Sequence, residues 1–325
     1  MSNPADVSEK NEPRHEENLL AQIQEFLGGI QIGGAIHHQE ITLFPTFGEG
    51  QDQRTYLLLK EALEMGDAVI TEVSSDGEVP ALKVINHSDL PLFIPEGEIL
   101  VGGKQNRVVN ITIIIQPGSA AVIPVSCVER GRWNRSTQSF QSGFHAPPSM
   151  RAMKTASVQS NRARGRNSVS DQCGVWDQVE CCMESLNASS ETDSLTDAFR
   201  EIRDKVKDYS DHLVLPEKAS GFIVGIGGRV AGMDVFDSSH TAQSLWPKIS
   251  EGYLMQSVME RRGVEGTPLM EVTDFLSEVS HNLKVSRREG DGVTELEVRC
   301  PSVVGFAVLH NGHLCHLSAF PRQGQ

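Results

Sequence analysis

Apolar and polar positions alternate along several short stretches between residues 36 and 130. Period-two runs bounded by Gly, Pro, Asn, Asp or Ser are typical of antiparallel strands. The clearest are ITLFPTF, DAVITEV, ALKVIN, LPLFI, VVNITIII and AAVIPVSCV, and a short helical pattern, YLLLKEALEM at 56–65, interrupts them. We therefore predict that residues 18–150 form a β-rich domain with an antiparallel sandwich or barrel-like core.

A spacing of three to four residues between apolar positions predicts helices elsewhere in the chain. The pattern NLLAQIQEFL predicts a first helix at 18–27, and the polar residues 1–17 before it are predicted to be a disordered tail. Further helices are predicted at 172–186, 194–210, 240–261 and 269–279.

The β pattern returns after Pro216. GFIVGI and VAGMDVF flank a Gly-Gly pair at 227–228, and VGFAVLH and HLCHLSAF flank Asn-Gly at 311–312, the strongest short signal for a hairpin. Residues 151–325 are therefore predicted to form a second half with helices and antiparallel hairpins. The whole chain is predicted to be α+β. The boundary near residue 150 is soft, and one integrated domain is the alternative.

The composition is that of an ordinary globular protein, with 38% hydrophobic and 22% charged residues in a chain of 325. No stretch reaches the roughly 18 apolar residues of a membrane-spanning helix, so no membrane association is expected. The polar, acidic start of the chain lacks the pattern of a signal peptide, and six cysteines do not make a disulfide scaffold in a chain of this length. These features predict a cytoplasmic location.

The net charge of −14 disfavours general binding to nucleic acid. Residues 130–170 reverse this charge locally, because they contain eight Lys or Arg and no Asp or Glu. Since residues 134–170 are also rich in Ser, Asn, Gly and Pro, we predict a loop or a loosely ordered lid there. The segment indicates a site for a small anion such as phosphate. A solvated basic loop that pairs with acidic neighbours is the alternative.

The segment EGEILVGGKQNRVVN carries more polar residues than a strand requires. Glu98 is a candidate general acid or base, and Lys104 and Arg107 are candidates for binding phosphate or carboxylate. Gln105 and Asn106 add hydrogen-bonding groups between the two cations. The glycines do not have the spacing of a phosphate-binding P-loop. The alternative is a Gly-rich edge strand with an ion-paired rim.

A second polar segment, SCVERGRW, ends a predicted strand. Cys127 is a candidate nucleophile, and Glu129 is a second candidate base. Arg132 beside Trp133 suits a phosphate that lies next to a stacked base. A buried cysteine that only packs and a tryptophan that covers the β core are the alternatives.

The segment SDQCGVW is typical of a helix start, with Ser170 or Asp171 as the N-cap. Asp171, Gln172 and Trp176 are the residues here that would instead face a ligand. Histidines and a cysteine at 310–316 fit an exposed hairpin better than a zinc site, so no metal site is predicted.

In order and spacing, these blocks resemble a poorly characterised family, the ARG-and-rhodanese-phosphatase-superfamily-associated protein domain, in which ARG denotes ADP-ribosylglycohydrolase. The resemblance covers residues 40–133 and 170–179, and GGRVAGMDVFDS is its clearest part further on. It implies a shared genomic context with enzymes that process NAD-derived ADP-ribose. It implies no established reaction or cofactor. The polar residues it carries over are Glu98, Lys104, Gln105, Asn106, Arg107, Cys127, Glu129, Arg132, Trp133, Asp171, Gln172 and Trp176.

The first hypothesis is an enzyme or binding domain that acts on ADP-ribose or a related nucleotide. The cations would hold the pyrophosphate, Trp133 or Trp176 would stack on the base, and Glu98 or Glu129 would be the general base. The second hypothesis is a non-catalytic module that senses a ligand or a partner through the same pocket. A third makes residues 130–170 an arm for nucleic acid or an acidic partner. The bond broken and the oligomeric state are left open.

Overall fold

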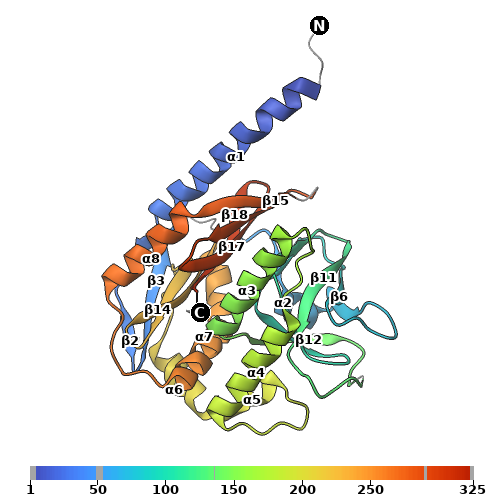
Figure 1. Cartoon of the computed structure of the whole chain (residues 1–325), viewed down its shortest axis with the longest axis vertical. Helices are drawn as coiled ribbons and strands as arrows, with labels where there is room; N and C mark the ends of the chain where they lie inside the picture. Colours follow the sequence, from blue (N-terminus) through green and yellow to red (C-terminus); the bar gives the residue numbers. More distant parts are fainter. Residues whose placement is uncertain (1–4, 49–53, 135, 289–290, 323–325) are drawn as a thin grey trace.

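Two β systems lie side by side, and helices cover both faces of the larger one (Figure 1). The computed structural model describes residues 5–48, 54–134, 136–288 and 291–322. Helices and antiparallel sheets are both well represented, so the predicted α+β class is confirmed.

The larger system is a nine-stranded antiparallel sheet built from both ends of the chain. Strand β3, which the sequence placed in the N-terminal β-rich domain, pairs with β13 in this sheet. The predicted boundary near residue 150 therefore does not separate the two β systems. The strand order is β1 (Gln31–Ile32), β3 (Ile41–Phe47), β13 (Gly221–Ile226), β14 (Arg229–Phe236), β18 (His313–Pro321), β17 (Val303–His310), β16 (Val293–Arg299) and β15 (Leu283–Arg288), with β2 (Ile36–His38) paired to β3.

Helices cover this sheet on both sides. Ile223 of β13 packs into the core beneath α1 (Ala5–Gly28) and α8 (Leu269–His281), whereas its neighbours Phe222 and Val224 join the core beneath α7 (Ser239–Glu260). A strand with both faces covered is apolar throughout, which is why GFIVGI shows no alternation. Helix α1 extends beyond the rest of the molecule (Figure 1).

The smaller system is the predicted barrel-like core. Its two sheets enclose a cluster of aliphatic side chains that includes Ile70, Val84, Leu100 and Val109. Strands β4 and β7 pair in parallel, and the remaining described pairs are antiparallel. One sheet has the order β12 (Phe140–His145), β8 (Glu98–Gly102), β9 (Arg107–Val109), β11 (Ala120–Cys127), β6 (Ala81–Asn86) and β5 (Ala68–Glu72), and the other has β10 (Ile113–Ile115), β7 (Leu92–Ile94) and β4 (Leu57–Leu58).

The predicted helices after residue 170 are present with one change. The single helix expected at 194–210 is two, α5 (Leu195–Glu201) and α6 (Arg203–His212), because the chain breaks at Ile202. The others are α4 (Gln172–Leu186), α7 and α8, and the short helix within the β-rich region is α2 (Leu59–Met65).

Both predicted hairpins form, β13–β14 and β17–β18. Their turn residues all have positive φ, 54° and 83° at Gly227 and Gly228, and 52° and 82° at Asn311 and Gly312. Two consecutive left-handed residues give the turn whose twist matches that of paired strands, and Gly and Asn adopt this conformation most readily.

The prediction of a loop or lid at 134–170 is wrong. This segment contains β12 and a buried helix, α3 (Pro148–Ala163). The buried face of α3 includes Arg151 and Lys154 next to Met150 and Val158. Because charged residues share that face, the helix does not show the apolar stripe by which helices are recognised.

The predicted disordered tail overlaps α1, which begins at Ala5. Residues 1–4 lie outside the described part of the chain, and residues 5–17 belong to the helix. Ala, Glu and Lys in this stretch have high helix propensity, which the polar composition concealed.

Among the described helices, none combines the length and the apolar character that crossing a membrane demands.

Candidate functional site

Two neighbouring strands of the six-stranded sheet bring the polar motifs together. Strand β9 pairs with the end of β11, so that Arg107 lies opposite Cys127. Paired residues of antiparallel strands project to the same face of a sheet. The two motifs that the sequence singled out therefore form one cluster, which we call the Arg107 site and define by Lys104, Gln105, Arg107, Cys127 and Trp133.

Arg107 is the least usual member of this site, because it is fully buried and has no carboxylate partner among the described residues. Its Nη1 donates to Gln105 Oε1 at 3.1 Å and to the Asn106 carbonyl at 3.5 Å. Its Nε and Nη2 have no hydrogen-bond partner. Burial lowers the pKa of Arg107, and Cys127 and Glu72 only partly oppose that effect.

Trp133 covers Arg107 from the outside. The Arg107 Cζ lies 5.7 Å from the centre of the indole ring, and the Lys104 Nζ lies 5.3 Å from it. Both distances are typical of cation–π contacts. The tryptophan is 43% exposed and stands in the irregular segment after β11. A buried guanidinium thus lies under a large aromatic side chain that faces solvent.

Cys127 is held as a neutral thiol. Its Sγ lies 3.0 Å from the Glu129 carbonyl and 3.2 Å from Gln105 Oε1. Burial raises the pKa of Cys127, and the Glu129 backbone, Arg107 and Trp176 only partly offset this rise. Because the thiolate is the nucleophilic form, the site favours a packing role for Cys127 over catalysis.

Glu129 is fully engaged by its neighbours. Arg132 binds it through two nitrogens, Nε to Oε1 at 2.8 Å and Nη2 to Oε2 at 2.6 Å. The Asn106 backbone N–H and the Thr192 hydroxyl also donate to it. Burial alone would raise the pKa of Glu129, but these hydrogen bonds outweigh burial and lower it. A carboxylate with a lowered pKa is a weak base. Its hydrogen bonds connect the segments that carry Asn106, Arg132 and Thr192.

Glu98 lies in a different cluster. Its Oε1 accepts from Ser142 at 2.6 Å and from Lys248 of α7 at 2.7 Å. Neither partner contacts the Arg107 site through any described hydrogen bond or ion pair. The expectation that Glu98 would converge on the same pocket as Arg107 and Trp133 therefore has no support in the contacts.

The three candidate ligand-binding residues near the start of α4 make separate contacts within the protein. Asp171 caps the helix, with its side chain accepting from Cys173 N at 3.1 Å. Gln172 brackets the Cys127 backbone, because its amide accepts from Cys127 N and donates to Cys127 O, each at 2.8 Å. The Cζ atom of Arg130 lies 5.2 Å from the centre of the Trp176 ring, which is a cation–π contact. Gln172 therefore fixes the strand that carries Cys127.

A hollow of about 520 Å³ is lined by residues that neighbour the Arg107 site in the chain, although none of the five residues that define the site lines it. Asn106, Glu129 and Arg132 line it together with the segment 189–197. Three larger hollows, of about 930, 700 and 550 Å³, lie elsewhere, and of the predicted site residues only Asp171 lines any of them. We give more weight to the hollow of about 520 Å³ because three predicted site residues, Asn106, Glu129 and Arg132, line it.

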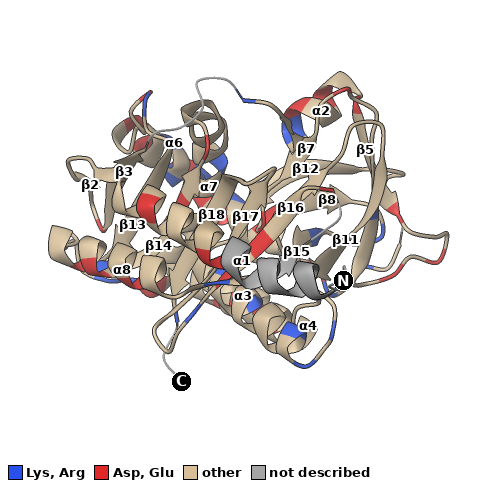
Figure 2. Cartoon of the chain, turned by 90° about the horizontal axis from the view of Figure 1, so that it is seen from above, with Lys and Arg blue, Asp and Glu red and all other residues tan. Residues whose placement is uncertain are grey.

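The basic segment at 130–170 is not a continuous positive surface. Arg132, Arg151, Lys154 and Arg162 all form ion pairs with carboxylates of the chain. Basic and acidic positions are interspersed on the elements seen in Figure 2. The alternative in which this segment pairs with acidic neighbours therefore describes it better than an arm for nucleic acid.

A buried network of charges surrounds α3, and no pattern in the sequence predicted it. Arg151 bonds to Glu96 Oε1 at 2.7 Å and to both oxygens of Asp234, at 2.5 and 2.9 Å. Lys154 bonds to Glu96 Oε2 at 2.8 Å, and His316 bonds to Asp234 at 3.0 Å. All five side chains are buried. Arg151 and Lys154 lie three residues apart on α3, but Glu96, Asp234 and His316 come from three distant parts of the chain, so no local pattern reveals the network.

The histidines near the C-terminal hairpin do not gather. His316 is buried in that network, and Cys315 is buried near Asp237. His310 lies 3.3 Å from Gln116. His316 and Cys315 are thus buried, whereas the sequence predicted an exposed hairpin.

The comparisons with known proteins give a family and no relative of established function. The sequence profile of the ARG and Rhodanese-Phosphatase-superfamily-associated Protein domain matches residues 29–320. No curated protein and no solved structure matches the chain. The profile spans the nine-stranded sheet, the barrel-like core and the Arg107 site. The chain therefore belongs to the ARG and Rhodanese-Phosphatase-superfamily-associated Protein domain family.

Proposed function

We propose that this chain binds a nucleotide of the ADP-ribose class, with a phosphate on Arg107. The observation that carries the proposal is a fully buried guanidinium with two unpartnered nitrogens. A buried cation without an ion-pair partner costs several kcal/mol, and the nearby charges of Glu72 and Glu129 only partly offset the effect of burial on Arg107. A bound anion would offset that cost, since guanidinium nitrogens suit phosphate oxygens in geometry and charge.

Trp133 supports a nucleotide over a simple anion. Its ring is exposed on one side and contacts Lys104 and Arg107 on the other. For a phosphate to reach Arg107, the ring must swing aside, and it could then stack on the base. Lys104 would pair with a second phosphate at the rim of the site. The two cations would thus bind the pyrophosphate of the nucleotide, and the displaced indole ring would stack on its adenine.

The hollow of about 520 Å³ lined by Asn106, Glu129 and Arg132 has the size of a small-molecule site, since such sites usually occupy several hundred Å³. The family's description associates the domain with ARG proteins, and ARG is understood as ADP-ribosylglycohydrolase. That association is the reason for choosing ADP-ribose among nucleotides, whereas the Arg107 site supports only an anion beside an aromatic ring.

Between catalysis and binding, the contacts favour binding. Glu129 is held by four donors, Cys127 is kept as a thiol, and Glu98 is paired with Lys248 in another cluster. A general base needs a free, correctly placed acceptor, and a nucleophilic cysteine needs a lowered pKa. We therefore favour the ligand-sensing form of the hypothesis over hydrolysis or group transfer.

The test is isothermal titration calorimetry of the full chain with ADP-ribose, ADP, ribose-5-phosphate and inorganic phosphate. We expect ADP-ribose and ADP to bind at least tenfold more tightly than ribose-5-phosphate, and Trp133→Ala to remove that preference for adenine. Arg164→Ala, which removes an exposed cation of the same basic segment, should leave the affinities unchanged. Equal affinities for all four ligands, or none, would contradict the proposal. Consumption of ADP-ribose during the titration would favour the enzymatic form instead.

A further inference from the structure

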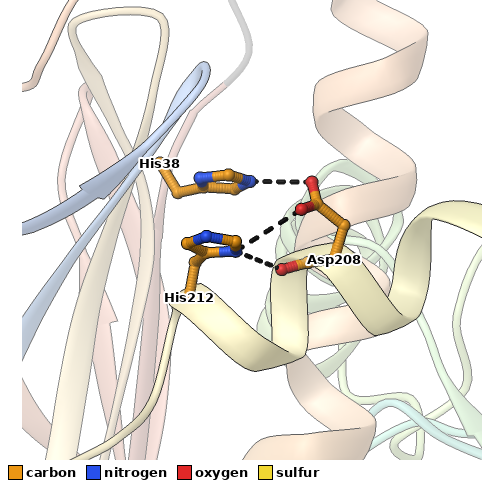
Figure 3. A group of neighbouring side chains, drawn as sticks. All are labelled: His38, Asp208 and His212. Carbon is orange, nitrogen blue, oxygen red and sulfur yellow. Dashed lines mark hydrogen bonds and ion pairs between the residues drawn. The ribbon is translucent and has the colours of Figure 1, made fainter.

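A second group of side chains, His38, Asp208 and His212, consists of residue types that bind metal ions and shares no residue with the Arg107 site. His38 ends strand β2 at the side of the nine-stranded sheet, and Asp208 and His212 stand one turn apart on α6. Figure 3 shows the carboxylate of Asp208 facing both imidazoles. The sequence offered no sign of this meeting, because 170 residues separate His38 from Asp208.

The distances place three donor atoms around one point. His38 Nε2 lies 2.8 Å from Asp208 Oδ2, and His212 Nδ1 lies 3.4 Å from Asp208 Oδ1. All three donor atoms lie within 4.8 Å of one another. Ligand atoms of a tetrahedral zinc ion are about 3.3 Å apart, given bond lengths of about 2.0–2.1 Å. The cluster is therefore close to the size of a metal shell.

The two imidazoles are stacked, with centroids 4.1 Å apart and planes 4° from parallel. A coordinated ion lies in the plane of each ring that binds it. At least one ring must therefore turn about its Cβ–Cγ bond. His212, at the end of α6 with a side chain 55% exposed, would give up the hydrogen bond between its Nδ1 and the Asp208 carbonyl at 2.7 Å when it turns.

Neighbouring groups hold the carboxylate in place. Gln39 Nε2 donates to Asp208 Oδ2 at 3.1 Å, and Gln39 has the unusual φ of 50° for a residue other than glycine. Tyr209 places its ring edge-on to His38 and donates to Glu40 at 2.9 Å. Outer groups that orient the ligands of an ion are a regular part of metal sites.

We propose that His38, Asp208 and His212 form a binding site for one Zn²⁺ ion or a similar divalent transition metal. Two nitrogen donors and one carboxylate suit this class of ion and disfavour Mg²⁺ and Ca²⁺, which prefer oxygen ligands. Three protein ligands leave a fourth position for water. The bound ion would join β2 to α6. It shares no residue with the Arg107 site, so the two proposals stand or fall separately.

The test is titration of the reduced, metal-stripped full chain with Zn²⁺ by calorimetry and with Co²⁺ by absorption spectroscopy. We expect one ion per chain, with visible Co²⁺ bands and no intense near-ultraviolet band from thiolate ligands. That spectral criterion distinguishes this site from the exposed cysteines Cys173 and Cys181. His212→Ala and Asp208→Asn should each weaken Zn²⁺ binding at least tenfold.

His281→Ala is the matched control. His281 also ends an exposed helix and also places its Nδ1 2.7 Å from the carbonyl four residues earlier, but no carboxylate or second histidine joins it in the described contacts. Its replacement should leave Zn²⁺ affinity unchanged. Absence of binding, an unchanged affinity in His212→Ala and Asp208→Asn, or a thiolate band in the Co²⁺ spectrum would each overturn the proposal.

Discussion

At the scale of single residues, buried polar side chains in this protein fall into two kinds. The carboxylates of Glu129 and Asp234 are each bound by an arginine. Arg107 and His145, in contrast, each have two side-chain nitrogens without a hydrogen-bond partner in the described part of the chain. An unsatisfied buried group costs stability, so such groups indicate either a function or a local weakness. Arg107 lies under the partly exposed ring of Trp133. His145 is enclosed, with both ring nitrogens unpartnered.

His145 should make the protein sensitive to acid. Burial, aided by the charge of Arg151, lowers its pKa from 6.5 to about 3. Between these two values the unfolded chain binds a proton that the folded chain does not, so stability falls as the pH falls. Relative to His145→Met, the wild-type protein should lose roughly 1.4 kcal/mol of unfolding free energy per pH unit below 6.5.

This prediction is measured by urea unfolding of both proteins at several pH values from 7 down to the acid limit of folding. The difference between the two proteins isolates His145, because Glu96 and Asp234 are present in both. Parallel stability curves across this range would show that His145 is not the group that binds the proton.

At the scale of elements, the sequence predicted what local chemistry determines. The two hairpins, α4 with its Asp171 cap, α7 and α8 follow from turn residues, capping residues and apolar spacing. Helix α3 could not be predicted in this way. Arg151 and Lys154 on its buried face are tolerated only because Glu96 and Asp234 arrive from distant strands, and no local pattern reveals a distant partner.

The sequence predicted only part of the candidate site. Arg107 and Cys127 were expected to share one pocket because both motifs are rich in polar residues, and they lie opposite each other on β9 and β11. Glu98 was expected to join them and does not, since its partner Lys248 comes from α7. The meeting of His38 with Asp208 depends wholly on tertiary packing, and no feature of the sequence indicates it.

The β17–β18 turn offers a direct test of local chemistry. Gly312 has φ of 82°, and nothing lies within 4 Å of the position that a Cβ atom would occupy. Gly312→Ala should therefore cost about 1–2 kcal/mol through backbone strain alone. Gly263→Ala, which also has open space but no positive φ, should cost less than about 0.5 kcal/mol. Chemical denaturation of both variants measures this, and equal effects would rule out strain at the turn.

At the scale of the whole molecule, the buried charges of α3 connect the two β systems. Arg151 joins Glu96, which precedes β8 of the six-stranded sheet, to Asp234 on β14 of the nine-stranded sheet. Burial would raise the pKa of both carboxyls, but Arg151 and its neighbours outweigh burial and lower it. Their contribution to stability is therefore present at neutral pH and is lost as the pH falls below the unfolded value near 4.

Arg151 and Arg107 make a matched pair, because both are fully buried arginines and only Arg151 has carboxylate partners. Replacing Arg151 by Met leaves two carboxylates unpaired and should cost about 3–5 kcal/mol. Replacing Arg107 by Met removes a charge that lacks a partner. That change should be neutral or stabilising if the guanidinium is kept for a ligand rather than for the fold.

The most direct test of the account is the unfolding free energy of wild type and Arg107→Met, each with and without ADP-ribose, with Arg151→Met as the reference for a structural arginine. The account predicts that Arg107→Met is at least as stable as wild type without ligand. It also predicts that ADP-ribose stabilises only the wild type, by about 2.7 kcal/mol at a hundredfold excess over its dissociation constant. An Arg107→Met protein that loses several kcal/mol like Arg151→Met, or that responds to ADP-ribose as wild type does, would contradict it.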